Sequence, residues 1–316
     1  MPYAALFPGQ GSQFVGMGAE LFELRPDLLG SEADRVLGWS LRRMCLEGPE
    51  EELTRTEHAQ PALFAVAYAL WSLWIEKTQV IPAAAAGHSL GEYTAMAAAG
   101  MIDYPTGLRL VAERGAAMAD AAAMNPSGMA ALLGVDLPQA EEIAARRRAD
   151  GGSLWVANIN APGQVVLAGA EEDVRWLESE SRRLGVRRVV RLKVAGAFHS
   201  PLMAPAADRL ARALGGVNFR PPRFPVFSNV TARPLQPEDA AELLARQLTS
   251  PVRFSDGLRA MAEAGAKRFV HIGPGDVTAG MARRAVPGCD TLVVSAADEV
   301  DQAAAALSSM GGPGGE

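Results

Sequence analysis

The chain has 316 residues, of which 49% are hydrophobic and 21% charged, as in a globular protein large enough for one big domain or two unequal ones. A formal net charge of −6, without a basic stripe carrying interleaved aromatic residues, argues against nucleic acid as a partner. No apolar run could span a bilayer and no signal-peptide pattern opens the chain, so we expect a cytoplasmic protein without a membrane segment. Cys45 and Cys289 lie far apart in the sequence and have no metal-ligand spacing, so we expect neither a disulfide scaffold nor a metal site.

The N-terminal part of the chain has the patterns of an α/β protein. A buried strand, YAALFP, leads into the glycine-rich turn GQGSQ, and an all-round apolar pattern at residues 61–77 predicts a buried helix. The stretch VIPAAAAGHSLGEYTAMAAAG then predicts a small-residue strand, a tight turn and a helix. Asp103 and Pro105 begin a further helix, which Asn125-Pro126 ends.

The middle of the chain has a different pattern. The strands are expected at GMAALLGV, LWVANIN, QVVLAG and RRVVRLKV, and the helices at LPQAEEIAARRRA and EEDVRWLESESRRLG. The resulting order, strand–helix–strand–strand–helix–strand, is that of a ferredoxin-like unit.

After this unit the α/β pattern returns, with strands expected at FPVFSN, RFVHIG and TLVVSA. We therefore predict an α/β fold with an α/β-hydrolase-like large subdomain, built from residues 1–125 and 195–310. A ferredoxin-like small subdomain at 126–194 is inserted in it. Residues 311–316, GGPGGE, are expected to form a disordered tail.

The sequence GHSLG matches Gly-x-Ser-x-Gly and raises the question whether Ser89 is a nucleophile or a polar residue at a turn. A serine at a sharp strand-to-helix turn exposes its hydroxyl at a helix N-terminus, where free N–H groups stabilise negative charge. Glycines on either side let the strand and the helix pass closely. The pattern alone is common, but the strand before it and the helix after it favour a catalytic Ser89.

A serine hydroxyl needs a base, and the chain has four histidines. His199 lies in the loop VAGAFHSPLM, whose small residues leave room around the ring, and it is the expected base. His88 adjoins the serine and is expected to point away from it and pack against the body. We expect His58 to cap or pack at a helix start and His271 to be a core histidine in a strand.

No acidic residue completes the Ser–Asp–His order of an α/β-hydrolase, because Asp173, the obvious candidate, falls on a helix of the ferredoxin-like unit. A backbone carbonyl can orient the base instead, so we expect a Ser89–His199 dyad. A general serine esterase is therefore the weakest interpretation.

The motifs along the chain resemble those of the bacterial malonyl-CoA:acyl carrier protein transacylases and the related acyltransferases of polyketide synthases. The matching segments run in the family's order over nearly the whole chain: FPGQGSQFVGMG (7–18), AQPALF (59–64), GHSLGEYTA (87–95), ERG (113–115), NINAPGQVVLAG (158–169), GAFHSPLM (196–203), SNVTA (228–232), QLTSPVRF (247–254) and GPGDVTAGM (273–281). An ordered set of this length is highly specific.

The resemblance implies transfer of a malonyl group from malonyl-CoA to the phosphopantetheine thiol of an acyl carrier protein, which supplies extender units for fatty acid or polyketide synthesis. In a ping-pong reaction, Ser89 would carry the malonyl ester and His199 would act as base in both halves. The backbone N–H groups of Gln10 and Leu90 would form the oxyanion hole, and the main-chain carbonyl of Gln247 would orient the histidine. CoA is then a substrate and phosphopantetheine belongs to the partner, so no resident cofactor is expected.

Two further positions bear on the choice of acyl group. Arg114 matches the arginine that pairs with the substrate's free carboxylate, a role that suits a planar, two-pronged guanidinium. Without the resemblance, a surface arginine paired with Glu113 or Asp120 would be the better interpretation. Phe198 matches the position whose bulk goes with malonyl rather than methylmalonyl, which implies selectivity for malonyl.

The chain departs from the family pattern at three positions: His271 where an acidic residue is usual, Asp276 where lysine is frequent and Thr278 where leucine is usual. The glycines of that segment are intact, so the fold is expected to hold. The departures bear on the surface around the active-site cleft and on the choice of carrier protein.

Two other functions remain open at this point. A hydrolase that clears acyl groups from carrier proteins would use the same serine and histidine but needs no carboxylate anchor. A non-catalytic docking module would not need the catalytic set at all.

Carrier proteins are acidic as a class, so binding one requires a local positive surface on this acidic chain. The candidates are Arg182, Arg183, Arg187 and Arg188. The alternative for these arginines is a solvated helix face and strand edge. We expect a free-standing, monomeric enzyme.

Overall fold

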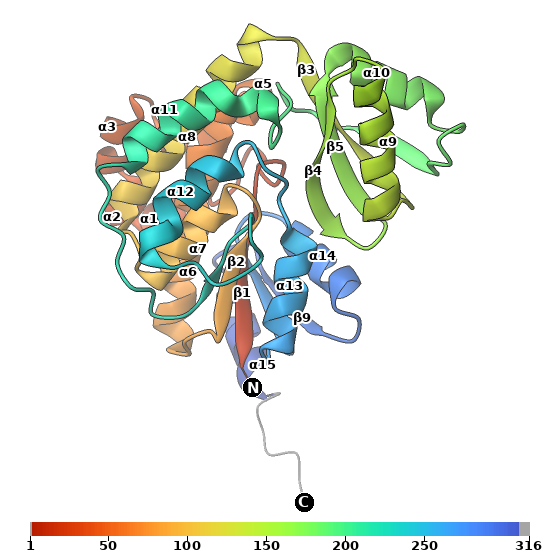
Figure 1. The fold of residues 1–316 in the computed structure, drawn as a ribbon. Helices are drawn as coiled ribbons and strands as arrows, with labels where there is room; N and C mark the ends of the chain where they lie inside the picture. Colours follow the sequence, from red (N-terminus) through yellow and green to blue (C-terminus); the bar gives the residue numbers. More distant parts are fainter. Residues whose placement is uncertain (1, 310–316) are drawn as a thin grey trace, which may run out of the picture.

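The protein contains two sheets of different kinds, seen in a computed structural model that describes residues 2–309 (Figure 1). The first is a five-stranded parallel sheet in the order β7-β2-β1-β8-β9, and the second is a four-stranded antiparallel sheet in the order β4-β5-β3-β6. The tail expected at 311–316 lies outside the described residues.

The central strands of the parallel sheet are buried on both faces. Its strands are β1 (Tyr3–Phe7), β2 (Ala84–Gly87), β7 (Val226–Phe227), β8 (Arg268–Ile272) and β9 (Asp290–Val294). Along β1, Tyr3, Ala5 and Phe7 join one core cluster while Ala4 and Leu6 join another. Because successive side chains of a strand point to opposite faces, the continuous apolar run YAALF can fill both cores at once.

Helices make up most of the rest of this large body. They are α1 (Leu21–Leu24), α2 (Pro26–Leu29), α3 (Ser31–Leu37), α4 (Leu41–Glu47), α5 (Glu50–Thr54), α6 (Thr56–Thr78), α7 (Gly91–Ala99), α8 (Tyr104–Met124), the 3-10 turn η1 (Pro201–Met203), α11 (Ala204–Leu214), α12 (Pro237–Gln247), α13 (Phe254–Glu263), α14 (Val277–Ala285) and α15 (Glu299–Ser309). Within residues 2–309, no helix combines the length and the apolar character that a membrane crossing requires.

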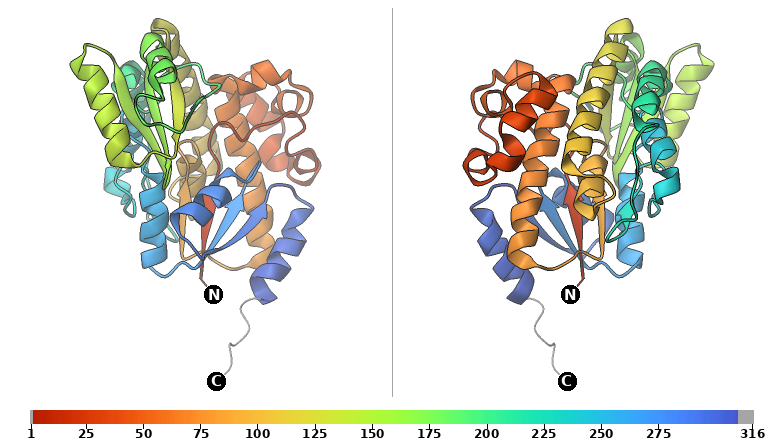
Figure 2. Two further views of the ribbon diagram at one scale, coloured as in Figure 1. Left: turned by 90° about the vertical axis from the view of Figure 1, so that its right-hand side faces the viewer. Right: turned by 90° about the vertical axis from the view of Figure 1, so that its left-hand side faces the viewer.

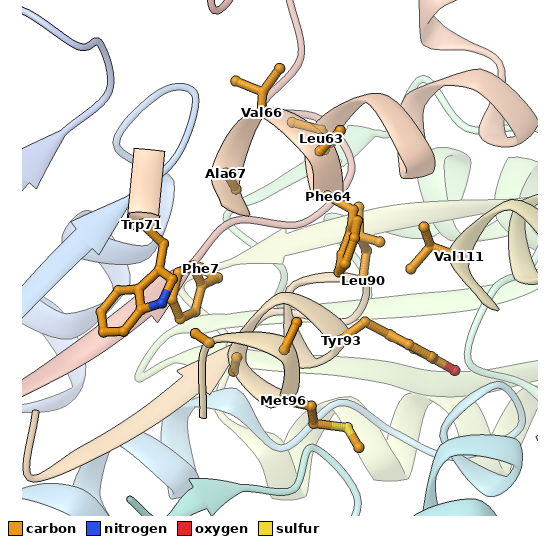
Figure 3. Close-up of a cluster of buried hydrophobic side chains, with 14 of the residues drawn as sticks. Phe7, Leu63, Phe64, Val66, Ala67, Trp71, Leu90, Tyr93, Met96 and Val111 are labelled. Atoms are coloured by element: carbon orange, nitrogen blue, oxygen red, sulfur yellow. The ribbon is translucent and has the colours of Figure 1, made fainter. Parts of the chain in front are cut away.

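The larger core packs α6 and α7 against the parallel sheet. Figure 3 shows Phe7 of β1 against Trp71 of α6, and the two rings meet edge to face with centroids 5.9 Å apart. Leu90 and Tyr93, just beyond the Ser89 turn, lie in the same cluster and are 1% and 0% exposed. The turn that carries Ser89 is therefore anchored on both sides by close-packed side chains.

The antiparallel sheet has the predicted ferredoxin-like form. Its elements are β3 (Ser127–Leu133), α9 (Leu137–Ala149), β4 (Leu154–Ala161), β5 (Gln164–Ala170), α10 (Glu171–Glu180) and β6 (Arg188–Arg191). Helices α9 and α10 cover its outer face, and Figure 2 shows this unit standing beside the large body. The predicted fold class, an α/β-hydrolase-like body with a ferredoxin-like insertion, is confirmed. The boundaries at 125/126 and 194/195 stay a prediction.

Backbone hydrogen bonds join the two parts. The N–H of Ile159 in β4 donates to the carbonyl of Val252 over 2.8 Å, and the N–H of Val252 donates back to Ala157 over 2.8 Å. The inner face of the antiparallel sheet, with Met129 and Val166, packs into the core of the large body. The functional site lies where this face meets the carboxyl ends of the parallel strands.

Three elements differ in extent from the sequence prediction. Helix α6 begins at Thr56 rather than at residue 61, so Pro61 lies inside it, where its missing N–H removes one backbone hydrogen bond. Helix α10 ends at Glu180, before a turn that closes on Gly185 with φ +69°. Strand β6 ends at Arg191, and the residues up to 194 leave the sheet toward the site.

Candidate active site

Ser89 stands at a turn that tolerates no side chain on its flanking glycines. Its φ of +51° lies in the left-handed region, which non-glycine residues rarely adopt. A Cβ on Gly87 would lie 1.8 Å from the carbonyl carbon of Gly91, and a Cβ on Gly91 would lie 2.3 Å from the carbonyl oxygen of Phe7. The predicted reason for these glycines, the close passage of strand and helix, is what the structure has.

Ser89 and His199 form a hydrogen-bonded pair. The Ser89 Oγ lies 2.8 Å from the His199 Nε2, and the His199 Nδ1 lies 2.8 Å from the main-chain oxygen of Gln247. A carbonyl oxygen only accepts, so Nδ1 carries the hydrogen and Nε2 is left to accept the serine proton. Asp173, the acid considered from the sequence, is bound to Arg147 in the small subdomain instead.

The environment of His199 keeps its ring neutral. The side chain is buried, at 4% exposure. Burial first, and the nearby charge of Arg114 second, lower its pKa to about 3. A histidine that is neutral at physiological pH is able to accept a proton.

Arg114 is fully buried next to the serine. Its Nη2 donates to the Ser89 Oγ over 2.9 Å and to the Gln247 Oε1 over 2.8 Å, and its Nη1 donates to the Gln60 Oε1 over 2.5 Å. Its Nε is buried without a hydrogen-bond partner. The alternative from the sequence, a surface arginine, is wrong, because Glu113 and Asp120 both bind Arg209.

These side chains meet at a cavity of about 230 Å³. Of the residues predicted from the sequence, six line it: Gln10, Ser89, Leu90, Arg114, Phe198 and His199. The inner face of the antiparallel sheet closes the other side with Met129, Asn158, Asn160 and Val166. The cavity thus lies between the two subdomains, and both are needed to form it.

Gln10 and Leu90 both line this cavity, and each carries a backbone N–H group. Neither donates a hydrogen bond to another group of the described residues. The turn before Gln10 approaches the serine closely, since a Cβ on Gly9 would lie 2.4 Å from the carbonyl oxygen of His88. The Gln10 side chain is held by Thr56, with its Nε2 donating to Oγ1 over 3.0 Å.

The other histidines occupy structural positions. His271 is fully buried and bonded to Thr278 and to the carbonyl of Gly273, as expected for a core histidine. His58 packs at the start of α6, where its Nδ1 bonds the carbonyl of Glu52. The expectation for His88 is incomplete: its ring packs on Phe254 of the body, but its Nε2 also reaches the Asn160 Oδ1 of the small subdomain over 2.8 Å.

Sequence reasoning missed three polar residues of the site. Gln60 holds Arg114, Asn229 accepts a hydrogen bond from the backbone N–H of Ser89 over 2.7 Å, and Glu92 is bound to Gln247. All three lie within motifs quoted above, AQPALF, SNVTA and GHSLGEYTA. The signal that could have found them is their place inside these motifs, because polar residues that a motif buries need hydrogen-bond partners.

Known proteins resemble the chain over nearly its full length. The model of the acyl transferase domain family matches residues 5–304. The malonyl CoA-acyl carrier protein transacylase of Bacillus subtilis is 38% identical over 303 residues, 95% of this chain and 95% of that protein. The polyketide biosynthesis malonyl CoA-acyl carrier protein transacylase BaeC of Bacillus velezensis is 39% identical over 280 residues, 88% of this chain and 95% of that protein.

A solved structure is similar to the same extent. It contains a malonyl-transacylase in complex with its type II PKS acyl-carrier protein, PlMCAT:AntF. It matches with a TM-score of 0.92 and 37% identity, covering 97% of this chain and 100% of that chain.

Proposed function

The chain belongs to the acyl transferase family, among the malonyl-CoA:acyl carrier protein transacylases, and from this premise we propose that it moves a malonyl group through an ester on Ser89. The donor is malonyl-CoA and the acceptor is the phosphopantetheine thiol of an acyl carrier protein. One observation carries the proposal: a single hydroxyl is hydrogen-bonded both to a neutral histidine and to a buried arginine. The first activates a nucleophile, and the second recognises a carboxylate on the acyl group.

In the first half-reaction, the Ser89 Oγ attacks the thioester carbonyl carbon while the His199 Nε2 takes its proton. The C–O bond forms, the C–S bond breaks, and the CoA thiol leaves with the proton that His199 held. Gln10 and Leu90 offer backbone N–H groups to the oxyanion of the tetrahedral intermediate, each worth about 3 kcal/mol in comparable sites. Their lack of other hydrogen-bond partners supports this role.

The second half-reaction reverses the first with a different thiol. His199 takes the proton of the phosphopantetheine thiol, the sulfur attacks the malonyl ester, and Ser89 recovers its proton. The Gln247 carbonyl keeps the same tautomer of His199 in both halves, so one base serves both steps. No resident cofactor takes part.

Arg114 selects acyl groups that carry a carboxylate. Its Nε is buried without a hydrogen-bond partner among the described residues, so it can donate to a carboxylate of the substrate, and an acetyl group would leave it unpaired. Phe198, 4% exposed, lies in the cavity wall and limits bulk beside the acyl chain. Together they favour malonyl over acetyl and over methylmalonyl.

The carrier protein is acidic as a class and needs positive charge on this enzyme. Arg182, Arg187 and Arg188 are exposed and form no ion pair among the described residues, whereas Arg183 is paired with Glu180. Reversing the charge of Arg187 and Arg188 should slow discharge to the carrier protein and leave loading from malonyl-CoA unchanged. Unchanged carrier-protein kinetics would remove these two arginines from the proposal.

The deciding experiment is intact-protein mass after brief mixing with malonyl-CoA, acetyl-CoA or methylmalonyl-CoA, for the wild type and for Ser89→Ala. A malonyl adduct that is absent from the variant and discharged by a carrier protein is the expected result. An adduct lost to water as fast as to carrier protein would indicate a hydrolase, and no adduct from any donor would indicate a docking module.

We further propose that the protein is a monomer and acts in the cytoplasm. Light scattering after gel filtration tests the oligomeric state, and cell fractionation tests the location.

A further inference from the structure

Glu92 is a buried carboxyl group that the reaction described above does not use. It lies on α7, three residues after Ser89, and is 1% exposed. Its Oε2 accepts hydrogen bonds from the Gln247 Nε2 over 2.5 Å and from the backbone N–H of Asn229 over 3.2 Å. Neither partner is charged, and burial raises the pKa of Glu92 to about 7. A carboxyl group with this environment can change protonation near neutral pH.

One amide joins Glu92 to Arg114. The side chain of Gln247 accepts from the Arg114 Nη2 through its Oε1 and donates to Glu92 through its Nε2. A cation and a carboxyl group thus act on opposite ends of the same amide. Among the described residues, Arg114 forms no ion pair, because the oxygens bound to it belong to amides and a hydroxyl.

The other ionisable groups around this pair carry no compensating charge. Burial raises the pKa of Tyr93, whose ring lies under the guanidinium of Arg114, and therefore keeps its hydroxyl neutral. Burial also lowers the pKa of His88 and His199, so both rings are neutral at physiological pH. From the elements packed against α7, the charge that acts on Glu92 is that of Arg114 on α8.

We propose that Glu92 balances the charge of Arg114 before loading and takes up a proton from solvent when the malonyl carboxylate pairs with Arg114. This inference rests on the function proposed above. A loaded site would otherwise hold two buried carboxylates and one cation, and two like charges in one buried site are not both retained. The malonyl carboxylate has the direct contact with the guanidinium, so Glu92 is the group that becomes neutral.

The surroundings of Glu92 suit both protonation states. Besides the two N–H donors, the Ser228 hydroxyl lies near enough to lower the pKa of Glu92. A hydroxyl can donate to the ionised carboxylate and, after turning, accept from the protonated carboxyl. The hydrogen bonds from Gln247 and Asn229 can stay in place in both states.

The proton balance of loading is simple near neutral pH. The Ser89 proton leaves on the CoA thiol, which stays protonated below a pKa of roughly 8.5, as for an ordinary thiol. Acylation itself therefore neither consumes nor releases a proton there, and any uptake belongs to the protein. Loading that takes up a proton must also become tighter as pH falls from about 8 to about 7, by linkage.

The test is a single turnover in weakly buffered solution containing a pH indicator, with enzyme and malonyl-CoA at equal concentration. Intact mass counts the ester formed in the same sample. The wild type should take up a measurable fraction of one proton per ester formed, with uptake in the range pH 7 to 8. The Glu92→Gln variant should form the ester without uptake.

The outcomes separate this inference from the proposed function. An ester without proton uptake at any pH from 6.5 to 8.5 in the wild type overturns the role of Glu92, as does equal uptake by Glu92→Gln. Failure to form an ester counts against the proposed function instead. Should the variant not fold, an infrared difference spectrum of the wild type decides: loading must convert a carboxylate band into a protonated-carboxyl band.

Discussion

Arg114 donates a hydrogen bond to the Oγ of Ser89 over 2.9 Å, so the guanidinium proposed to bind the substrate carboxylate is in direct contact with the hydroxyl proposed to attack the thioester. In a malonyl thioester, one methylene group separates the carboxylate from the carbonyl that is attacked. A carboxylate seated on Arg114 thus brings the reacting carbon to Ser89. On the proposed mechanism, substrate specificity and positioning of the reacting carbon therefore arise from the same contact.

The first prediction concerns that contact. Arg114→Gln removes the charge, and kcat/KM for malonyl-CoA should fall about 10- to 100-fold, because hydrogen bonds to charged groups contribute about 1.5–3 kcal/mol. Transfer of acetyl should change much less. Steady-state kinetics with both donors measure the effect, and Arg109→Gln, an exposed arginine on the same helix, is the control. Equal losses for the two donors would show that Arg114 does not read the carboxylate.

The second prediction concerns Asn229, which supports the strained backbone of the nucleophile. Its Oδ1 accepts from the Ser89 N–H over 2.7 Å and its Nδ2 donates to the Gly87 carbonyl over 2.8 Å. Asn229→Ala leaves both groups unpaired, at a cost of about 1–3 kcal/mol each. We expect kcat to fall about tenfold or more while KM changes little; exposed Asn218→Ala is the control. An unaltered kcat in a folded Asn229→Ala protein would contradict the positioning role.

The third prediction concerns stability and pH. Burial lowers the pKa of His271 to about 4, so between pH 6.5 and pH 4 the unfolded chain binds a proton at this residue that the folded protein does not. The stabilising contribution is complete above pH 6.5 and is lost as pH falls. Glu92 has the opposite sign, because its raised pKa lets the folded state bind a proton first between about pH 7 and its ordinary value.

Urea unfolding at pH 6.5, 6.0 and 5.5 separates the two groups. His271→Gln should flatten the dependence of the free energy of unfolding on pH, by up to about 1.4 kcal/mol per pH unit. Glu92→Gln should make it steeper. Variants whose slopes match the wild type would refute the assignment of these protonation states.

Local patterns were sufficient to predict most of the fold. Period-two and helical patterns located the strands of both sheets and the helices α6 to α10, since these signals lie within each segment, and α9 begins and ends at the predicted residues. The short helices α1 to α5 and the helices from α11 onward were not located individually. Element ends were less predictable. Helix α6 begins at Thr56, before the predicted start, and the Thr56 hydroxyl bonds Gln10 of a distant loop, a contact that no local signal contains.

In the candidate site, too, local features could be predicted from the sequence, whereas contacts between distant residues could not. Ser89 and its glycines form a local motif, and His199 followed from its loop, so both could be found by reading along the chain. The interactions that tune them join residues far apart in the sequence, such as Asn229 with Ser89 or His88 with Asn160. The first pair comes from packing within the large subdomain and the second from the docking of the two subdomains, and a single sequence encodes neither as a pattern.

The last prediction concerns the size of the acyl group. Phe198→Ala should open the cavity wall beside the acyl chain, raising kcat/KM for methylmalonyl-CoA relative to malonyl-CoA about 10- to 100-fold, as expected when one methyl group is relieved of a clash. Phe224→Ala is the matched control, since Phe224 is equally buried but packs on Trp71 away from the cavity. Both variants should lose stability, and only the first should change selectivity. Acetyl-CoA should remain a poor donor for Phe198→Ala, because an acetyl group gives Arg114 no carboxylate partner. If the variant discriminates against methylmalonyl-CoA as strongly as the wild type does, residues other than Phe198 set this selectivity.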